Sequence, residues 1–189
     1  MILNKCDESS LKICAELLKE NKILILPTDT VYGFSGVVGK TDEKIRKIKG
    51  REENKPFIQL VGKPEDIFLL TNDVVPEKLL SLWPGPLTII VHKKQDPAET
   101  VAVRCPGDEW LRKLIAACGS PVYSTSVNRS GFPVLSKISE IKNEFEKDVD
   151  LIVSAGDSES SVPSTIVRLD EGKISVVRKG ALDVEKILG

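Results

Sequence analysis

The chain has 189 residues, and its 27 Lys and Arg nearly balance its 28 Asp and Glu, which gives a formal net charge of −1. That balance argues against a protein that binds nucleic-acid phosphates over much of its surface, although it is compatible with a local basic face. No apolar run approaches the ~20 residues of a membrane span, no signal-peptide pattern opens the chain, and the four cysteines are scattered without a CxxC pair. We therefore expect one cytoplasmic domain over residues 1–189, without a disulfide framework or a structural zinc site.

The first predicted elements are a helix and a buried strand that leads into a polar segment. Ser9 and Ser10 can cap a helix that runs through about Lys19, with apolar residues at helical spacing on one face. The apolar run 23–26 predicts a buried strand, which Pro27 should end because proline lacks the N–H that a sheet ladder needs. The polar side chains that follow belong to Thr28, Asp29, Thr30 and Tyr32. Such side chains either cap their own turn or face a ligand, and this segment alone leaves both interpretations open.

A second predicted helix carries basic residues to its end. Asp42 is the expected cap, and Gly50 the expected stop, because glycine suits the left-handed position after a helix. Lys49 and Arg51 flank Gly50, and Lys55 follows, so these cations are placed to hold phosphate groups. A solvated helix face and the helix dipole explain the same residues without any ligand.

The remaining elements alternate without a steady βαβ rhythm. Apolar runs predict strands, and apolar spacing of three to four residues predicts helices. We therefore predict an α/β fold with one twisted, mixed β-sheet and flanking helices. Strands are expected over residues 57–61, 87–92, 100–104, 151–153, 164–169 and 173–178, and another strand is expected to start at residue 121. Helices are expected from the turn at 106–108 to 119, over 138–145 and after Asp183. Residues 64–82 are expected to form a polar or helical segment.

Two side chains at strand ends bear on the chemistry. His92 is the only histidine and closes a predicted strand, so Ser-His-Asp and Cys-His catalysis are poor interpretations. Arg104 shares one face of its strand with Thr100 and Ala102. An arginine at the end of a core strand needs a carboxylate, a phosphate or water, and a salt bridge within the fold is the simpler interpretation.

Polar loops follow later in the chain. Residues 121–131 start as a strand and continue as a loop rich in Ser, Asn and Gly, which either builds turns or binds a polar ligand. Residues 157–163 form another polar loop, and Glu171 and Gly172 should turn a hairpin that ends at Arg178. Neither G-x-G-x-x-G nor G-x-x-x-x-G-K-[ST] occurs, so the standard nucleotide fingerprints do not apply.

Together these segments resemble the YrdC-like family, the threonylcarbamoyl-adenylate synthases, in its short single-domain, TsaC-type form. The family pattern runs P-T-[DE]-T-x-Y-G, K-x-R, [KN]-P-[LF], W-P-G-P, T-x-x-x-R, S-x-N-x-S-G-x-P, S-T-[IV] and R-x-G. The chain supplies all of these motifs in order, and each alone would be weak evidence. It departs from the residues common in the family at Leu60, Thr125, Val127 and Val134.

The resemblance implies a reaction that condenses L-threonine, bicarbonate or CO2 and ATP to threonylcarbamoyl-AMP and pyrophosphate. The product would feed the threonylcarbamoyl modification of the adenosine beside the tRNA anticodon. Threonine carbamate would be the nucleophile, so no protein nucleophile is expected. Mg2+ is expected with ATP, held by phosphate oxygens and water, and we name no protein ligand for it.

Position by position, the resemblance assigns residues to the two larger substrates. For L-threonine it implies Thr30, Tyr32, Arg104, Ser124 and Ser164. Arg104 would pair with the threonine carboxylate, because a guanidinium fork fits that shape. For ATP and its phosphates it implies Lys49, Arg51, Lys55, Thr100, Ser126, Asn128 and Arg178.

Two other functions stay open at this point. One is a carbamoyl-transfer domain, because YrdC-like domains also occur within larger hydrogenase-maturation proteins. The other is a non-enzymatic RNA-binding protein, because residues 40–55 hold seven Lys or Arg against four Asp or Glu. For a synthase we expect weak binding of RNA or tRNA, contact with the downstream tRNA threonylcarbamoyl-transfer complex, and no membrane partner.

Overall fold

The computed structural model describes residues 1–51, 56–158 and 162–183. Within these ranges ten strands form one sheet in the spatial order β1-β8-β2-β3-β7-β4-β6-β5-β9-β10. The strands are β1 (Ile2–Asn4), β2 (Leu24–Leu26), β3 (Gly33–Ser35), β4 (Ile58–Leu60), β5 (Leu87–His92), β6 (Thr100–Arg104), β7 (Val122–Ser126), β8 (Leu151–Ser154), β9 (Thr165–Asp170) and β10 (Lys173–Arg178). The helices are α1 (Ser10–Lys19), α2 (Asp42–Lys49), α3 (Glu77–Leu80), α4 (Glu109–Cys118), α5 (Ile138–Phe145) and the 3-10 helix η1 (Pro64–Leu69).

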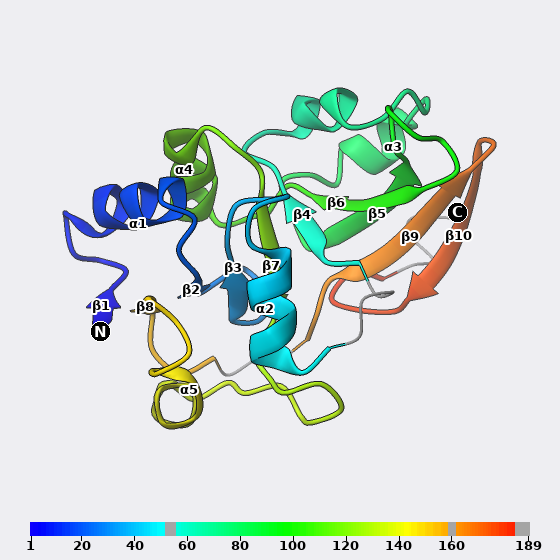
Figure 1. Ribbon diagram of the computed structural model, residues 1–189. Helices are drawn as coiled ribbons and strands as arrows, with labels where there is room; N and C mark the ends of the chain where they lie inside the picture. The colour runs from blue at the N-terminus through cyan, green and yellow to red at the C-terminus, as the bar shows by residue number, and fades with distance from the viewer. Residues whose placement is uncertain (52–55, 159–161, 184–189) are drawn as a thin grey trace.

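The sheet is mixed, which confirms the predicted fold class. β2 runs parallel to β8 and antiparallel to β3, and β4 runs parallel to β6 and antiparallel to β7. β7 joins the two halves, because it pairs with β3 on one side and with β4 on the other. The β9–β10 hairpin closes one end of the twisted sheet, and β1 closes the other (Figure 1).

Helices cover both faces of the half that contains β2, which explains why that strand is apolar throughout. Leu24 and Leu26 join a buried cluster with residues of α1 and α4. Ile23 and Ile25 join a second cluster with residues of α2 and α5. Successive side chains of a strand point to opposite faces, so a strand covered on both sides needs apolar residues at every position.

The helix ends follow local signals, with one correction. Gly50 has a φ of 60°, the left-handed conformation expected after α2. Asp108 caps α4, and its side chain accepts the backbone N–H of Leu111 at 2.9 Å. The expected cap of α2 is wrong by one residue, because Thr41 occupies the cap position and Asp42 is already helical. An acidic residue is also favoured in the first turn by the helix dipole, so the two positions look alike in sequence.

The structure also adds two strands of three residues each, β1 and β3, that the sequence did not predict. The helix expected after Asp183 lies outside the described residues. Of the helices in the described ranges, none has the length and apolar character needed to cross a membrane.

Candidate functional site

A cavity of about 180 Å³ opens where the loop after β2 meets β6, β7 and the segment before β9. Its described lining contains three arginines and no Asp or Glu. Such a lining favours an anionic ligand, because cations gathered around one cavity repel one another and an anion between them relieves that repulsion. Seven of the residues proposed from sequence line this cavity: Thr30, Arg51, Arg104, Ser124, Ser126, Ser164 and Arg178.

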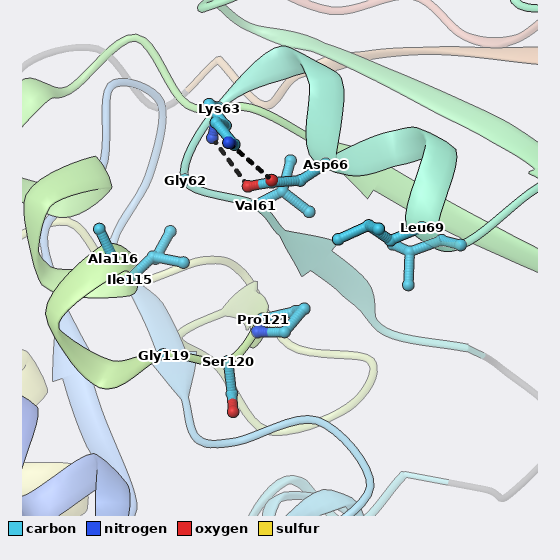
Figure 2. Close-up of a pocket in the computed structure, with 11 residues that line it drawn as sticks. Val61, Gly62, Lys63, Asp66, Leu69, Ile115, Ala116, Gly119, Ser120 and Pro121 are labelled. Carbon is cyan, nitrogen blue, oxygen red and sulfur yellow. Dashed lines mark hydrogen bonds and ion pairs between the residues drawn. The ribbon is translucent and has the colours of Figure 1, made fainter.

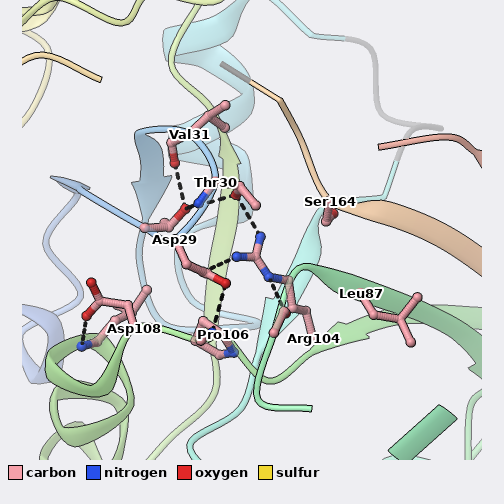
Figure 3. Close-up of polar contacts among 12 residues, drawn as sticks. Asp29, Thr30, Val31, Leu87, Arg104, Pro106, Asp108 and Ser164 are labelled. Atoms are coloured by element: carbon pink, nitrogen blue, oxygen red, sulfur yellow. Dashed lines mark hydrogen bonds and ion pairs between the residues drawn. The ribbon is translucent and has the colours of Figure 1, made fainter. Parts of the chain in front are cut away.

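Arg104 is buried, at 3% exposed, and Figure 3 shows its contacts. Its Nη2 pairs with Oδ1 of Asp29, and its Nη1 donates to the hydroxyl of Thr30 at 2.9 Å. Its Nε donates to the carbonyl of Gly85 at 3.3 Å. Burial lowers the pKa of Arg104, and the Asp29 carboxylate acts in the opposite direction. A guanidinium has five N–H donors, so two remain beyond these contacts with described residues.

Residues 83–86, which carry the W-P-G-P motif, contact Arg104. Gly85 donates its N–H to the carbonyl of Cys105 at 2.9 Å, while its own carbonyl accepts Nε of Arg104. Trp83 fastens the same turn, because its Nε1 donates to the carbonyl of Leu87 at 2.7 Å. The salt bridge within the fold that the sequence favoured for Arg104 is therefore present, and it leaves donors free for a ligand.

Arg178 and Ser164 form the opposite wall. Arg178 donates to the Ser164 carbonyl from Nε at 3.1 Å and from Nη2 at 2.8 Å, and Nη2 also contacts the Ser164 hydroxyl at 3.2 Å. Burial and the charge of Arg104, which lines the same cavity, lower the pKa of Arg178. Gly180 lies so near the backbone of Pro163 and Ser164 that a Cβ there would collide with it. The R-x-G motif thus keeps Arg178 against Ser164.

Lys49 is buried under the loop that follows β7. Its Nζ donates to the carbonyls of Ser126 and Asn128 and to Oδ1 of Asn128, the last at 2.9 Å. Burial and the charge of Arg51 lower the pKa of Lys49 to about 7. The three surrounding oxygens favour the protonated form, so they oppose that effect. Lys49 and Asn128 hold each other outside the described lining of the cavity.

Arg51 reaches the cavity because the left-handed Gly50 turns the chain after α2. Its Nη1 donates to the hydroxyl of Thr125 at 3.2 Å, and its guanidinium carbon lies 4.9 Å from the centre of the Phe57 ring. Burial, and then the charge of Arg46, lower the pKa of Arg51. Its Nε is buried and has no hydrogen-bond partner among the described residues. A buried donor left unpaired is costly, which is consistent with a ligand at this point.

Other predicted site residues lie elsewhere. The hydroxyl of Tyr32 donates to the carbonyl of Gly156 at 2.7 Å and accepts the N–H of Ala155 at 2.8 Å, outside the cavity. Thr100 starts β6 opposite His92 of β5, also outside the described lining. Lys55 lies outside the described residues. Their assigned roles stay predictions.

The sequence assigned no role to two residues that the structure places at the site. Asp29 carries the counter-charge of Arg104, and Thr125 accepts Nη1 of Arg51. Asp29 was visible as a carboxylate within the polar segment after β2, but nothing local indicated its partner 75 positions away. Across the described ranges, no three His, Cys, Asp or Glu side chains group in a way that suits a metal ion.

Another cavity, of about 440 Å³, lies between η1 and the end of α4 (Figure 2). Its lining is mainly apolar, apart from Ser120 and from Lys63 and Asp66, which form an ion pair with each other at 4.0 Å. None of the residues assigned from sequence lines it. Its size exceeds that of the arginine-lined cavity, but it lacks unpaired charges, so we place the candidate site at the latter.

Comparison with known proteins gives a consistent set of similarities. A family model for Sua5, YciO and YrdC proteins, described as "Telomere recombination", matches residues 16–180. A "Putative threonylcarbamoyl-AMP synthase" of Methanocaldococcus jannaschii is 34% identical over 193 residues, which cover 96% of this chain and 92% of that protein. The "Threonylcarbamoyl-AMP synthase" of Pyrococcus abyssi is 29% identical over 205 residues, and this chain spans only 60% of its length.

Solved structures agree with the sequence comparison. The structure of P. abyssi Sua5 complexed with L-threonine has a TM-score of 0.89 at 30% identity and covers 99% of this chain, which spans 59% of that one. E. coli YciO shares the fold, with a TM-score of 0.85 at 24% identity over 99% of this chain and 97% of its own. The predicted resemblance is confirmed, and the chain belongs to the Sua5/YciO/YrdC family.

Proposed function

We propose that this protein is a threonylcarbamoyl-AMP synthase, which joins L-threonine, bicarbonate or CO2 and ATP. The observation that carries the proposal is the cavity in which three arginines and five hydroxyl residues from separate segments converge without a carboxylate in the described lining. The threonine complex of the P. abyssi relative supports an amino-acid ligand. The names of the curated relatives support an adenylate product.

Threonine fits the part of the cavity around Arg104. The two donors that Arg104 does not use on described residues suit a carboxylate, which accepts such a pair side by side. The hydroxyls of Thr30, Ser124 and Ser164 line the same cavity and supply neutral hydrogen bonds. Tyr32 would shape the pocket from behind. A lining without carboxylates disfavours the ammonium form of the substrate and favours an uncharged amine, the form that reacts with CO2.

ATP fits the part around Arg51 and Arg178. The cavity is smaller than the ~300–1,000 Å³ of pockets that enclose drug-sized ligands, so a nucleotide would extend beyond it. The remaining residues proposed to hold ATP and its phosphates are Lys49, Lys55, Thr100, Ser126 and Asn128. Mg2+ would enter as MgATP, held by phosphate oxygens and water, because the described cavity lining offers no carboxylate for it.

The proposed chemistry requires positioning and charge neutralisation from the protein. Threonine's amine adds to CO2 and loses a proton to give the carbamate. A carbamate oxygen then attacks the α-phosphorus, the bond from that phosphorus to the bridging oxygen breaks, and pyrophosphate leaves with the electron pair. The arginines would stabilise the charge on the transferred group and on pyrophosphate, which is the main contribution that proteins make to such reactions. No side chain has to act as a nucleophile.

The experiment that tests this function is pyrophosphate release with each substrate omitted in turn. The purified protein is incubated with ATP, Mg2+, bicarbonate and L-threonine, and the adenylate is identified by mass spectrometry. We expect release only when all four are present. Equal release without threonine would contradict the proposal. Release with carbamoyl phosphate in place of threonine and bicarbonate would instead favour a carbamoyl-transfer domain.

The product would serve tRNA modification in the cytoplasm. Under this proposal a tRNA threonylcarbamoyl-transfer complex downstream consumes threonylcarbamoyl-AMP, and this protein needs no tight RNA contact of its own. The near-neutral net charge of −1 is consistent with that division of labour.

A further inference from the structure

The side chain of Asp29 contacts two segments, the end of β6 and the turn before α4 (Figure 3). Its Oδ1 pairs with Nη2 of Arg104. Its Oδ2 accepts the backbone N–H of Gly107 at 2.8 Å. The Asp29 side chain is 18% exposed and that of Arg104 only 4%, so water screens the pair weakly. Removing one partner of such a pair leaves the other charge buried and uncompensated.

Asp29 contacts Arg104 but does not itself line the cavity. Arg104 belongs to the described lining, whereas Asp29 does not. The other contacts of Arg104 are neutral oxygens, the hydroxyl of Thr30 and the carbonyl of Gly85. Among the described residues, Asp29 is therefore the charged group that fixes the guanidinium. A charge-assisted hydrogen bond constrains a guanidinium more strongly than neutral acceptors do.

The carboxylate of Asp29 is itself held by a turn that leaves room for it. A Cβ at Gly107 would lie 3.0 Å from Oδ2 of Asp29, so a larger residue would push the carboxylate away. The next residue, Asp108, caps α4 and pairs with Lys5. The Gly107 N–H is thus anchored at the start of α4, and it holds Asp29 independently of Arg104.

We infer that Asp29 is a positioning residue for the amino-acid substrate, which acts by fixing the guanidinium plane of Arg104. The inference rests on the proposed function, in which Arg104 binds the substrate carboxylate. With Asp29 in place, the free donors of Arg104 keep one direction, and the carboxylate meets a preorganised fork. Without the charge of Asp29, only neutral acceptors would hold the Arg104 guanidinium against repulsion from the neighbouring cation of Arg178.

The first test separates effects on threonine from effects on ATP. Asp29→Asn keeps the shape and removes the charge, so we expect the KM for threonine to rise about tenfold, the low end for a lost charge-assisted interaction. We expect the KM for ATP to change less than about twofold. Asp29→Glu restores a carboxylate and should recover most of the threonine KM. A merely structural role would lower stability and active fraction without this selective change in KM.

A double-mutant cycle tests whether Asp29 works through Arg104. On an Arg104→Ala background, Asp29→Asn should cause no further loss of threonine affinity, because the group it positions is gone. Independent, additive losses would overturn the inference. So would a wild-type threonine KM in Asp29→Asn.

Gly107→Ala tests the same point without removing any charge. It should displace the Asp29 carboxylate and raise the threonine KM about threefold, while Gly62→Ala, whose Cβ would meet its nearest neighbour at 3.6 Å, should leave it unchanged. If Asp29→Asn fails to fold, the comparison of Gly107→Ala with Gly62→Ala tests the inference instead. Equal effects of these two variants on the threonine KM would overturn the inference.

A crystal structure of Asp29→Asn separates the inference from the proposed function. A displaced Arg104 guanidinium would support the positioning role, and an unmoved guanidinium would overturn it, whatever the enzyme turns over. Absence of threonine-dependent turnover in the wild-type protein would count against the proposed function instead.

Discussion

Arg104 and Arg51 line one cavity with different partners. Arg104 is fixed by Asp29 and Thr30, whereas Arg51 follows Gly50 at the end of α2 and keeps a buried donor without a described partner. Burial lowers the pKa of both guanidinium groups, because it removes water that stabilises their charge. A bound anion would stabilise that charge in place of the water. Under the proposed function, Arg104 would bind the threonine carboxylate and Arg51 would bind phosphate.

Substitution of each arginine should therefore affect a different ligand. Arg104→Ala should weaken threonine binding by on the order of tenfold to a hundredfold, because a hydrogen bond to a charged group contributes ~1.5–3 kcal/mol. Its effect on ATP binding should be small. Arg51→Ala should weaken ATP binding, and the effect should shrink for adenosine, which has no phosphates. Calorimetric titration with each ligand measures both effects.

The matched control is Arg168→Ala, which removes an exposed arginine of β9 outside the cavity. This variant should bind threonine and ATP like the wild-type protein. Normal threonine affinity in Arg104→Ala, or normal ATP affinity in Arg51→Ala, would show that the two arginines are not divided in this way.

At the scale of elements, the end of α2 and the loop after β7 hold each other. Lys49 donates into that loop through Nζ, and its own carbonyl accepts the N–H of Ser130 at 2.7 Å. Arg129 of the same loop donates to the carbonyl of Ile48. Two segments assigned to ATP therefore form one unit, in which the buried Lys49 carries a charge that depends on pH.

The stability of this unit should depend on pH through Lys49. Its pKa is about 7 in the folded protein, against about 10.4 for an ordinary lysine. Between these values the unfolded chain binds the proton and the folded chain does not, so the free energy of unfolding rises with pH; below pH 7 the full cost of the buried charge applies. From pH 7 to 9 this lysine should add about 2 kcal/mol.

Urea unfolding of the wild type and of Lys49→Met at pH 6, 7, 8 and 9 measures this dependence. Lys49→Met also leaves oxygen acceptors of the loop unpaired, but that cost does not vary with pH, so the slope is the informative quantity. Lys47→Met, at an exposed position of the same helix, should keep the wild-type slope. Equal slopes in all three proteins would show that the oxygens around Lys49 keep it protonated throughout.

Elements with local signals were predictable, and elements defined by distant partners were not. Gly50, Gly119 and Asp108 mark helix ends by their own chemistry, and the structure has each at the expected terminus. β1 is a three-residue edge strand whose partner, β8, begins at Leu151, so pairing and not composition makes it a strand. β3 begins at Gly33, a poor strand former, and depends on β2 and β7.

At the scale of the whole molecule, the strand order gathers the site. β7 lies between β3 and β4, and β6 lies beyond β4, so Ser124, Arg104 and the loop after β2 meet although they are far apart in sequence. The ordered motifs predicted seven residues that line one cavity, and they also included Tyr32 and Thr100, which lie outside its described lining. They did not indicate that Lys49 is buried against Asn128, because which side chain faces a cavity depends on packing that no local pattern encodes.

Some of the positive charge of the chain lies at exposed lysines near the start of α2, outside the cavity lining. The chain as a whole is near neutral, with a net charge of −1. Lys40, just before α2, and Lys44, in its first turn, are exposed. Lys44 donates to the carbonyl of Asn21 at 3.3 Å, and neither lysine belongs to the cavity lining. A few exposed cations on a neutral protein attract RNA weakly, and that attraction falls steeply with salt.

Any RNA binding should therefore be weak and separable from adenylate formation. The double variant Lys40→Glu/Lys44→Glu should lower affinity for an anticodon stem-loop RNA and flatten its salt dependence, because each phosphate contact contributes about one unit of slope. Threonine-dependent pyrophosphate release should stay unchanged. Lys12→Glu/Lys19→Glu, which reverses two exposed lysines on α1, changes the net charge equally and should affect RNA less. If Lys40→Glu/Lys44→Glu lost RNA affinity and pyrophosphate release together, RNA and ATP would share one surface.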